Sequence, residues 1–225
     1  MSSSKNILVI APHPDDETLG CGGTLLRHID EGDKVYWLIC TTITQKLGYS
    51  IDRLNLRQNE ISDVFMSYGF VGYKQLSFIT TELDLVSKRK LVIEISKYVH
   101  EVKPHTIYIP YRNDVHTDHA QVFDASIACT KSFRYPFVRK VCVYETLSET
   151  EFGMRTDDPG FKPNMWVNIS DYLDRKIEIM NIFESELGEH PFPRSESCIQ
   201  AKALLHGTIA SCKYAESFIQ IKSIR

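Results

Sequence analysis

Two short clusters of histidine and aspartate carry the residues of this chain that are best suited to chemistry. The first reads Pro12-His-Pro-Asp-Asp-Glu17, and the second, much later in the chain, reads Asn113-Asp-Val-His-Thr-Asp-His119. Imidazole and carboxylate groups are common ligands of zinc. A catalytic zinc ion has three protein ligands and one open position, whereas structural zinc prefers four ligands that are usually rich in thiolates. Together, the two clusters predict a catalytic metal site.

Each cluster alone is also compatible with an ordinary structural role. The first could be an Asp-rich turn that caps a helix, and the second a surface turn with a helix N-cap. Pro14 stiffens the first turn, because proline fixes its own φ and pushes the preceding His13 toward an extended conformation. His116 and His119 are three positions apart where a helix is expected from Ala120 onward, so they could share one helical face. Both clusters follow an apolar strand, and no other region combines histidine with acids in this way, which favours the metal site.

Apolar runs and amphipathic segments alternate along the chain. We expect strands over residues 7–11, 34–41, 106–110, 138–145 and 218–221. We expect helices over residues 20–32, 51–68, 83–102, 169–187 and 195–214. This alternation is typical of βαβ units, whose right-handed crossovers place helices on both faces of the sheet. The expected fold class is α/β, a Rossmann-like and mostly parallel sheet with the active site at the carboxyl ends of its strands.

Composition restricts the setting in which such a site would work. No repeat or shift in composition divides the chain, so we expect a single domain over residues 1–225. The net charge of −3 gives no electrostatic footprint for nucleic acid or for an anionic membrane. No apolar stretch approaches the length of a membrane span, and the acids at 15–17 argue against a signal peptide. The six cysteines form no C-x-x-C pair, which favours reduced thiols and a cytoplasmic location.

At the two clusters the sequence resembles the PIG-L/LmbE-like family of zinc-dependent de-N-acetylases, which includes N-acetylglucosaminyl deacetylases. The resemblance covers nearly the whole chain. It is supported more weakly by Gly20-Cys-Gly-Gly23, Arg57 with Glu60, Phe161-Lys-Pro-Asn164, Pro193-Arg-Ser195 and Ala215-Glu-Ser-Phe218. The resemblance implies zinc ligands at His13, Asp16 and His119. It also implies a general base at Asp15 and an acid or oxyanion-binding pair at His116 and Asp118. The chain departs from many relatives at His206, where arginine is expected.

Amide hydrolysis needs the groups that these positions supply. An amide is a poor electrophile, and zinc both activates water and polarises a carbonyl group. Asp15, next to a ligand but not itself a ligand, could take a proton from water and later pass one to the departing amine. His116, charged and held by Asp118, would face the oxyanion opposite the metal.

The residues around the reaction centre leave more than one function open. Arg57 is a candidate substrate contact, although an ion pair with Glu60 on a helix surface is the more ordinary role. Asp114 is a second candidate substrate contact, or a solvated loop residue. The leading hypothesis is a hydrolase that removes the acetyl group from an N-acetylated amino sugar, a small-molecule substrate. The alternatives are a metal-dependent protein that binds a sugar or nucleotide sugar without cleaving it, and a hydrolase of another amide substituent. A homo-oligomer is compatible with each of these.

Overall fold

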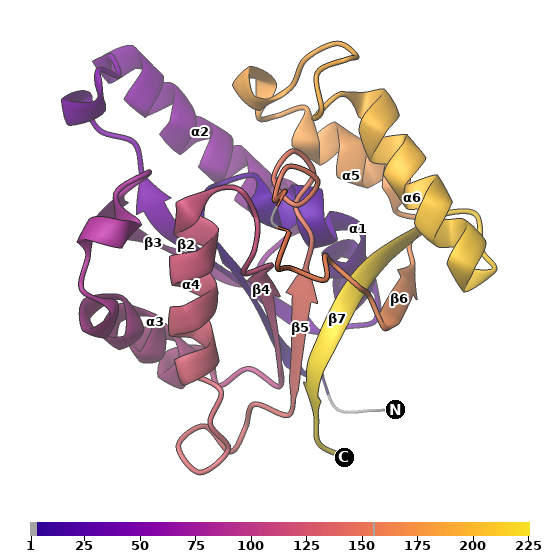
Figure 1. The fold of residues 1–225 in the computed structure, drawn as a ribbon, viewed down its shortest axis with the longest axis horizontal. Coiled ribbons are helices and arrows are strands. Elements are labelled where there is room, and N and C mark those ends of the chain that lie inside the picture. The colour runs from indigo at the N-terminus through magenta and orange to yellow at the C-terminus, as the bar shows by residue number, and fades with distance from the viewer. Residues whose placement is uncertain (1–3, 155) are drawn as a thin grey trace.

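Seven strands form one sheet in the computed structural model, which describes residues 4–154 and 156–225 (Figure 1). The order of the strands across the sheet is β3-β2-β1-β4-β5-β7-β6. Their bounds are β1 Asn6–Ala11, β2 Lys34–Thr42, β3 Gly72–Ile79, β4 Thr106–Pro110, β5 Lys140–Tyr144, β6 Met165–Asn168 and β7 Ala215–Ser223. The first five strands pair in parallel, and β7 runs antiparallel to both β5 and β6. The α/β fold with a mostly parallel sheet is therefore confirmed.

Helices cover both faces of this sheet (Figure 1). Their bounds are α1 Asp16–Asp30, α2 Ile51–Tyr68, α3 Lys88–Val102, α4 Thr117–Ala128, α5 Leu173–Met180 and α6 Glu196–Ala210. Three short 3₁₀ turns lie between them, η1 Gln45–Leu47, η2 Leu83–Leu85 and η3 Glu184–Glu186. Side chains along β1 alternate between the faces: Ile7 and Val9 pack with α1, α2, α5 and α6, and Leu8 and Ile10 pack with α3 and α4. A strand buried on both faces has the continuous apolar sequence that predicted it.

The order of the strands reverses between β1 and β4. The chain leaves β1 toward β2 on one side, and it leaves β4 toward β5 on the other. In open α/β sheets, ligands bind outside the carboxyl ends of the strands at such a reversal. One of the two predicted clusters follows β1, and the other follows β4. The topology therefore places both clusters at the same edge of the sheet.

Two strands that the sequence did not predict lie at the two ends of the sheet. β3 has buried Leu76 and Phe78 between more exposed positions, and β6 is only four residues long. An edge strand has a neighbour on one side only, and polar side chains there limit pairing with other molecules. Lys74 and Gln75 of β3 fit this description. The apolar signal of both strands was weak for this reason.

Two helices differ from their expected bounds in ways that shape the site. α1 begins at Asp16 rather than at residue 20, which puts Asp16 and Glu17 in its first turn, where the helix dipole favours negative charge. The helix expected over 169–187 is only Leu173–Met180, and the chain then bends. The bend buries Phe183, whose ring lies 5.5 Å from the guanidinium carbon of Arg57 in α2. The 3₁₀ turn η3 is thereby held against α2.

The small residues of α1 allow the helix to approach its neighbours closely. A Cβ atom on Gly20 would lie 2.3 Å from Cδ2 of Tyr144, and one on Gly23 would lie 2.8 Å from Cβ of Ile169. Both distances are shorter than a normal contact between carbon atoms. The small residues therefore allow α1 to pack closely against β5 and the segment before α5.

All six cysteines are free thiols, and four of them are buried. In the described part of the chain, no helix is both long and apolar enough to cross a membrane.

We predict that Gly20→Ala destabilises the fold, because the added methyl group meets the ring of Tyr144. Overpacking of this kind typically costs about 1–3 kcal/mol in the free energy of unfolding. Urea unfolding of the variant and the wild type measures the difference. Gly72→Ala is the matched control, since its added Cβ would lie 3.4 Å from Tyr36, an ordinary contact. A Gly20→Ala variant that is as stable as the control would contradict the packing argument.

Candidate active site

The turn after β1 has a strained backbone at Asp15. Its φ is 131°, a value that residues other than glycine rarely adopt. Two neighbours hold the turn in this shape. Thr41 Oγ1 donates to the carbonyl of Pro12 at 2.8 Å, and Nη1 of Arg57 donates to the carbonyl of Pro14 at 3.1 Å. Strain of this kind persists only where the surroundings enforce it, and it is concentrated at functional sites.

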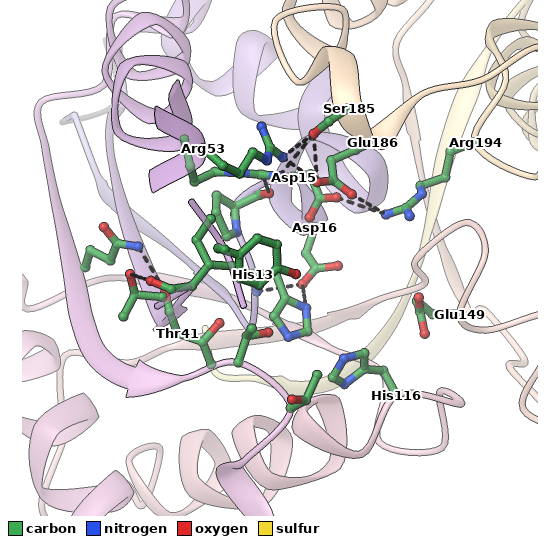
Figure 2. Close-up of a pocket in the computed structure, with 18 residues that line it drawn as sticks. His13, Asp15, Asp16, Thr41, Arg53, His116, Glu149, Ser185, Glu186 and Arg194 are labelled. Carbon is green, nitrogen blue, oxygen red and sulfur yellow. Dashed lines mark hydrogen bonds and ion pairs between the residues drawn. The ribbon is translucent and has the colours of Figure 1, made fainter. Parts of the chain in front are cut away.

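Asp16 brings the two histidine clusters together. Its Oδ2 lies 3.3 Å from Nδ1 of His13 and 3.4 Å from Nε2 of His119. The three ligand atoms lie within 4.8 Å of one another (Figure 2 shows His13 and Asp16). His119 is fully buried, yet its Nε2 has no hydrogen-bond partner among the described residues. A buried nitrogen without a partner is costly, and a metal ion shared with His13 and Asp16 would supply the missing partner. The residues present therefore fit a divalent metal.

The two consecutive aspartates differ in their electrostatics. Burial opposes the ionisation of Asp16, but the adjacent imidazoles of His119 and His13 hold its pKa well below the ordinary value. At Asp15, burial and then the negative charges of Asp16 and Glu186 raise the pKa well above the ordinary value, and nearby guanidinium groups partly offset this. Neighbouring acids whose pKa values are pushed apart are typical of acid–base sites. Asp16 is suited to ligate a cation, and Asp15 to exchange a proton.

A carboxylate stands behind each metal-facing imidazole. Oδ2 of Asp114 lies 2.7 Å from Nδ1 of His119, and its other oxygen accepts a hydrogen bond from Thr150 Oγ1 at 2.6 Å. Oδ2 of Asp118 lies 3.0 Å from Nε2 of His13. Carboxylates in this position fix the tautomer and orientation of histidine ligands. The arrangement leaves Nδ1 of His13 and Nε2 of His119 directed at Asp16 as acceptors.

These contacts differ from two expectations. Asp114 is only 8% exposed, uses both oxygens within the protein and does not line the pocket, so the structure does not support its expected contact with substrate. Asp118 does not hold His116 through its carboxylate. That carboxylate accepts backbone N–H groups of Thr81 and Leu83 at 2.8 and 3.1 Å, in addition to its contact with the first histidine. Asp114 lies in the loop after β4 and Asp118 in the first turn of α4. Their carboxylates contact the imidazoles of His119 and His13.

His116 lines the pocket at the N-terminus of α4. Its ring centroid lies 4.4 Å from that of His13. Burial, followed by the nearby imidazoles of His13 and His119, lowers the pKa of His116 to about 4, which favours the neutral form of the ring over the charged form that was expected. Nδ1 accepts a hydrogen bond from the backbone N–H of Asp118 at 3.1 Å, which leaves the ring hydrogen on Nε2. His116 can therefore donate a hydrogen bond without carrying a charge.

We call residues 13–16, which include His13 and Asp16, the metal turn. The metal turn and His116 line a cavity of about 420 Å³ (Figure 2). Its uncharged polar wall comes from the end of β2, from the middle of β3 and from the residues after β3, namely Thr41, Thr42, Gln75, Thr80 and Thr81. Tyr49, which is 39% exposed, adds an aromatic side chain to the lining. A cavity of this size and polarity can hold a small polar molecule next to the metal ligands.

The other end of the cavity is charged, and the sequence predicted only part of it. Arg57 is buried and lines the cavity, but it also pairs with Glu60, where Nε lies 3.1 Å from Oε2, and with Glu186. Arg194 reaches the same place from the segment before α6, and its Nη1 lies 3.1 Å from Oδ2 of Asp15. Glu186 was not singled out in the sequence because no motif surrounds it. Arg194 belongs to the weak Pro193-Arg-Ser195 match, which was the one available signal.

His206 lies outside this cavity. Its Nε2 is 2.6 Å from Oε1 of Glu145 and 3.1 Å from Oγ of Ser217. Where many relatives are expected to have arginine, this chain therefore has a histidine that contacts Glu145 and Ser217 outside the cavity.

Comparison with known families assigns the chain. A family model described as PIG-L, GlcNAc-PI de-N-acetylase, matches residues 8–130. This range exceeds half of the chain and contains both histidine clusters. The chain belongs to the PIG-L family. Within the PIG-L match lie all three converging ligands and the acids behind them, whereas Glu186 and Arg194 lie beyond it. The charged end of the cavity is thus contributed partly by residues beyond the PIG-L match.

Individual relatives agree with the family. The chain is 26% identical over 223 residues to a diacetylchitobiose deacetylase of Thermococcus kodakarensis, in a match that covers 94% of this chain and 81% of the relative. It is 24% identical over 195 residues to a probable N-acetyl-α-D-glucosaminyl L-malate deacetylase of Bacillus cereus, covering 81% and 84%. The solved N,N′-diacetylchitobiose deacetylase of Pyrococcus horikoshii superposes with a TM-score of 0.78 at 20% identity, covering 98% of this chain and 85% of that one. That structural likeness concerns the fold.

We predict that Asp114→Asn weakens metal binding, because the imidazole of His119 loses its charged partner. Loss of such a partner typically lowers metal affinity about 10- to 100-fold. Competition with a chromogenic chelator measures the affinity in the purified protein. Asp124→Asn is the matched control, since this acid lies on the same helix as His119 but pairs with the exposed side chains of Lys88 and Arg112. Equal metal affinities in the two variants would show that Asp114 does not support the metal site.

Proposed function

We propose that this chain is a zinc-dependent hydrolase that removes the acetyl group from an N-acetylated amino sugar, releasing acetate and a free amine. The observation that carries the proposal is the convergence of His13, Asp16 and His119 beside the unligated carboxylate of Asp15, in a chain of the PIG-L family. Relatives that act on N-acetylated sugars support the same substrate class. The mixture of nitrogen and oxygen ligands suits zinc.

The metal site in this proposal is held by three side chains and supported by two more. His13, Asp16 and His119 would hold the ion, and Asp118 and Asp114 would orient the two imidazoles. When bound, zinc activates water and polarises the carbonyl of the acetamido group. The open cavity next to the three ligands leaves room for that group.

Asp15 is the proposed general base. It is 4% exposed, its pKa is raised, and it belongs to none of the groups of converging ligand atoms in the described residues. It would take a proton from the attacking water and deliver a proton to the nitrogen as the C–N bond breaks. One water is consumed, and the products are acetate and the amine, so the protons balance.

His116 is the proposed hydrogen-bond donor to the oxygen that becomes negative during the attack. The neutral ring carries its hydrogen on Nε2 and lies beside His13 at the edge of the cavity. A donor already in position stabilises the developing charge without rearrangement during the reaction. The role is the one expected from the sequence, performed by a neutral ring.

The wider setting is part of the same proposal. We infer that residues 1–225 act as one catalytic domain in the cytoplasm on a small-molecule substrate. The six free thiols support a reducing compartment.

An acetate-release assay tests the proposal. The zinc-loaded protein is incubated with a panel of N-acetylglucosamine conjugates, and released acetate and the loss of one acetyl mass are measured. We expect release from at least one member of the panel and none after removal of the metal with a chelator. Binding of the conjugates without any acetate would instead favour a metal-dependent sugar-binding protein. Loss of a different acyl group would favour a hydrolase of another amide substituent.

We predict that Asp15→Asn retains zinc but loses turnover by about two to four orders of magnitude, because the base is removed. Asparagine has nearly the same size and shape as aspartate, so the turn should keep its shape. The measurements are kcat for acetate release and zinc content by atomic absorption. Turnover close to that of the wild type, at full zinc content, would exclude Asp15 as the base.

A further inference from the structure

The charged end of the cavity contains a cluster that the proposed reaction does not use. Among the described residues, three arginines line the cavity: Arg53 and Arg57 from α2, and Arg194 from the segment before α6. Figure 2 shows Glu186 between Arg53 and Arg194, on the opposite side of His13 from His116. The cluster therefore lies across the metal turn from the proposed hydrogen-bond donor.

Glu186 contacts all three of these guanidinium groups. Its Oε1 forms an ion pair with Nη2 of Arg57 and lies 3.4 Å from Nη2 of Arg53. Its Oε2 lies 3.5 Å from Nη1 of Arg194. The neighbouring Ser185 also accepts hydrogen bonds from the two arginines of α2. A single carboxylate thus occupies the position at which an anion from outside would meet three guanidinium groups.

Two further acids, the buried Glu60 and Asp15, also pair with these arginines. Glu60 lies 3.3 Å from Nη1 of Arg53 and 3.1 Å from Nε of Arg57. Asp15 lies 3.1 Å from Nη1 of Arg194. Three guanidinium groups therefore face three carboxylates, and each guanidinium has at least one carboxylate partner inside the protein. We call these six residues the balanced cluster: Arg53, Arg57, Arg194, Asp15, Glu60 and Glu186.

A balanced cluster disfavours an anionic ligand. Sites that recognise a carboxylate or phosphate offer the fork of an arginine for paired hydrogen bonds. Here an incoming anion would have to displace Glu186 from its arginines or lie close to its negative charge. Selectivity often arises from such an unfavourable contact with the wrong substrate. The neutral wall opposite, with the hydroxyl groups of Thr42 and Thr80, suits the hydroxyl groups of an uncharged ligand.

We propose that Glu186 determines the substrate class of this enzyme, by making the cavity selective for N-acetylated amino sugars whose aglycone is uncharged. The aglycone is the group attached to the anomeric carbon of the sugar. The inference rests on the proposed deacetylase function and adds to it. Of the two substrates named for the relatives above, the proposal favours the uncharged disaccharide over the dicarboxylate malate conjugate.

A matched pair of substrates tests the proposal on the wild-type enzyme. The carbamoylmethyl and carboxymethyl glycosides of N-acetylglucosamine have nearly the same size and differ by one negative charge. We expect kcat/KM for the uncharged glycoside to exceed that for the anionic glycoside by at least about tenfold, which corresponds to 1.4 kcal/mol. Equal values, or a preference for the anion, would overturn the inference and leave the deacetylase function intact. If neither glycoside, nor any other conjugate, releases acetate, the deacetylase function itself fails.

Glu186→Gln tests the residue. The substitution keeps the size of the side chain and one acceptor oxygen, removes its charge and leaves the arginines in excess. The preference for the uncharged glycoside should fall about tenfold, and because it is a ratio within one enzyme, effects on the metal or on Asp15 cancel. Glu184→Gln is the matched control, since this acid is in the same 3₁₀ turn but is exposed and does not line the cavity. An unchanged ratio in Glu186→Gln, or an equal fall in the control, would overturn the assignment.

Arg53→Gln provides a test in the opposite direction. Removing this guanidinium leaves Glu186 less neutralised, so the preference for the uncharged glycoside should increase. A preference that is unchanged or falls would contradict the repulsion assigned to Glu186. This variant also keeps the inference testable if Glu186→Gln does not fold.

Discussion

The pairing of β1 with β4 is the constraint on which the site depends. Ile7 pairs with Thr106, and Val9 pairs with Tyr108, so two strands far apart in the sequence end side by side. Since their crossovers lead to opposite sides of the sheet, a crevice opens above their carboxyl ends. Asp16 and His119 approach each other only in that crevice. The buried apolar side chains of both strands thus determine whether the ligands can converge.

Two segments of the chain contribute residues to the site. The segment that matches the PIG-L model contributes the converging ligands, the carboxylates behind them and the strained turn. The segment after α5 contributes Glu186 and Arg194, which lie over that turn and share its charges. Asp15 connects the two segments, because it lies in the strained turn and pairs with Arg194.

Much of this arrangement could be predicted from the sequence, for identifiable physical reasons. Central strands such as β1 are continuous apolar runs, and histidine next to acids directly after such a strand is typical of a ligand site. The edge strands β3 and β6 were missed because one-sided pairing leaves a weak apolar pattern. The roles of Asp114 and Asp118 were not predictable, since spacing reveals which residues share a turn but not the direction of each carboxylate. Glu186 was missed because its importance depends on three arginines from other parts of the chain.

The carboxylate of Asp118 also ties the site to the connection between β3 and η2. It accepts the backbone N–H groups of Thr81 and Leu83, and Thr81 has a positive φ of 66°. A main-chain donor does not depend on the identity of its side chain, but it moves when the number of residues before it changes. Surface connections usually tolerate insertions and deletions. Here a single residue gained or lost between Ile79 and Leu83 would withdraw both donors from a buried acid, so we expect the length of this connection to be conserved during evolution even where its side chains vary.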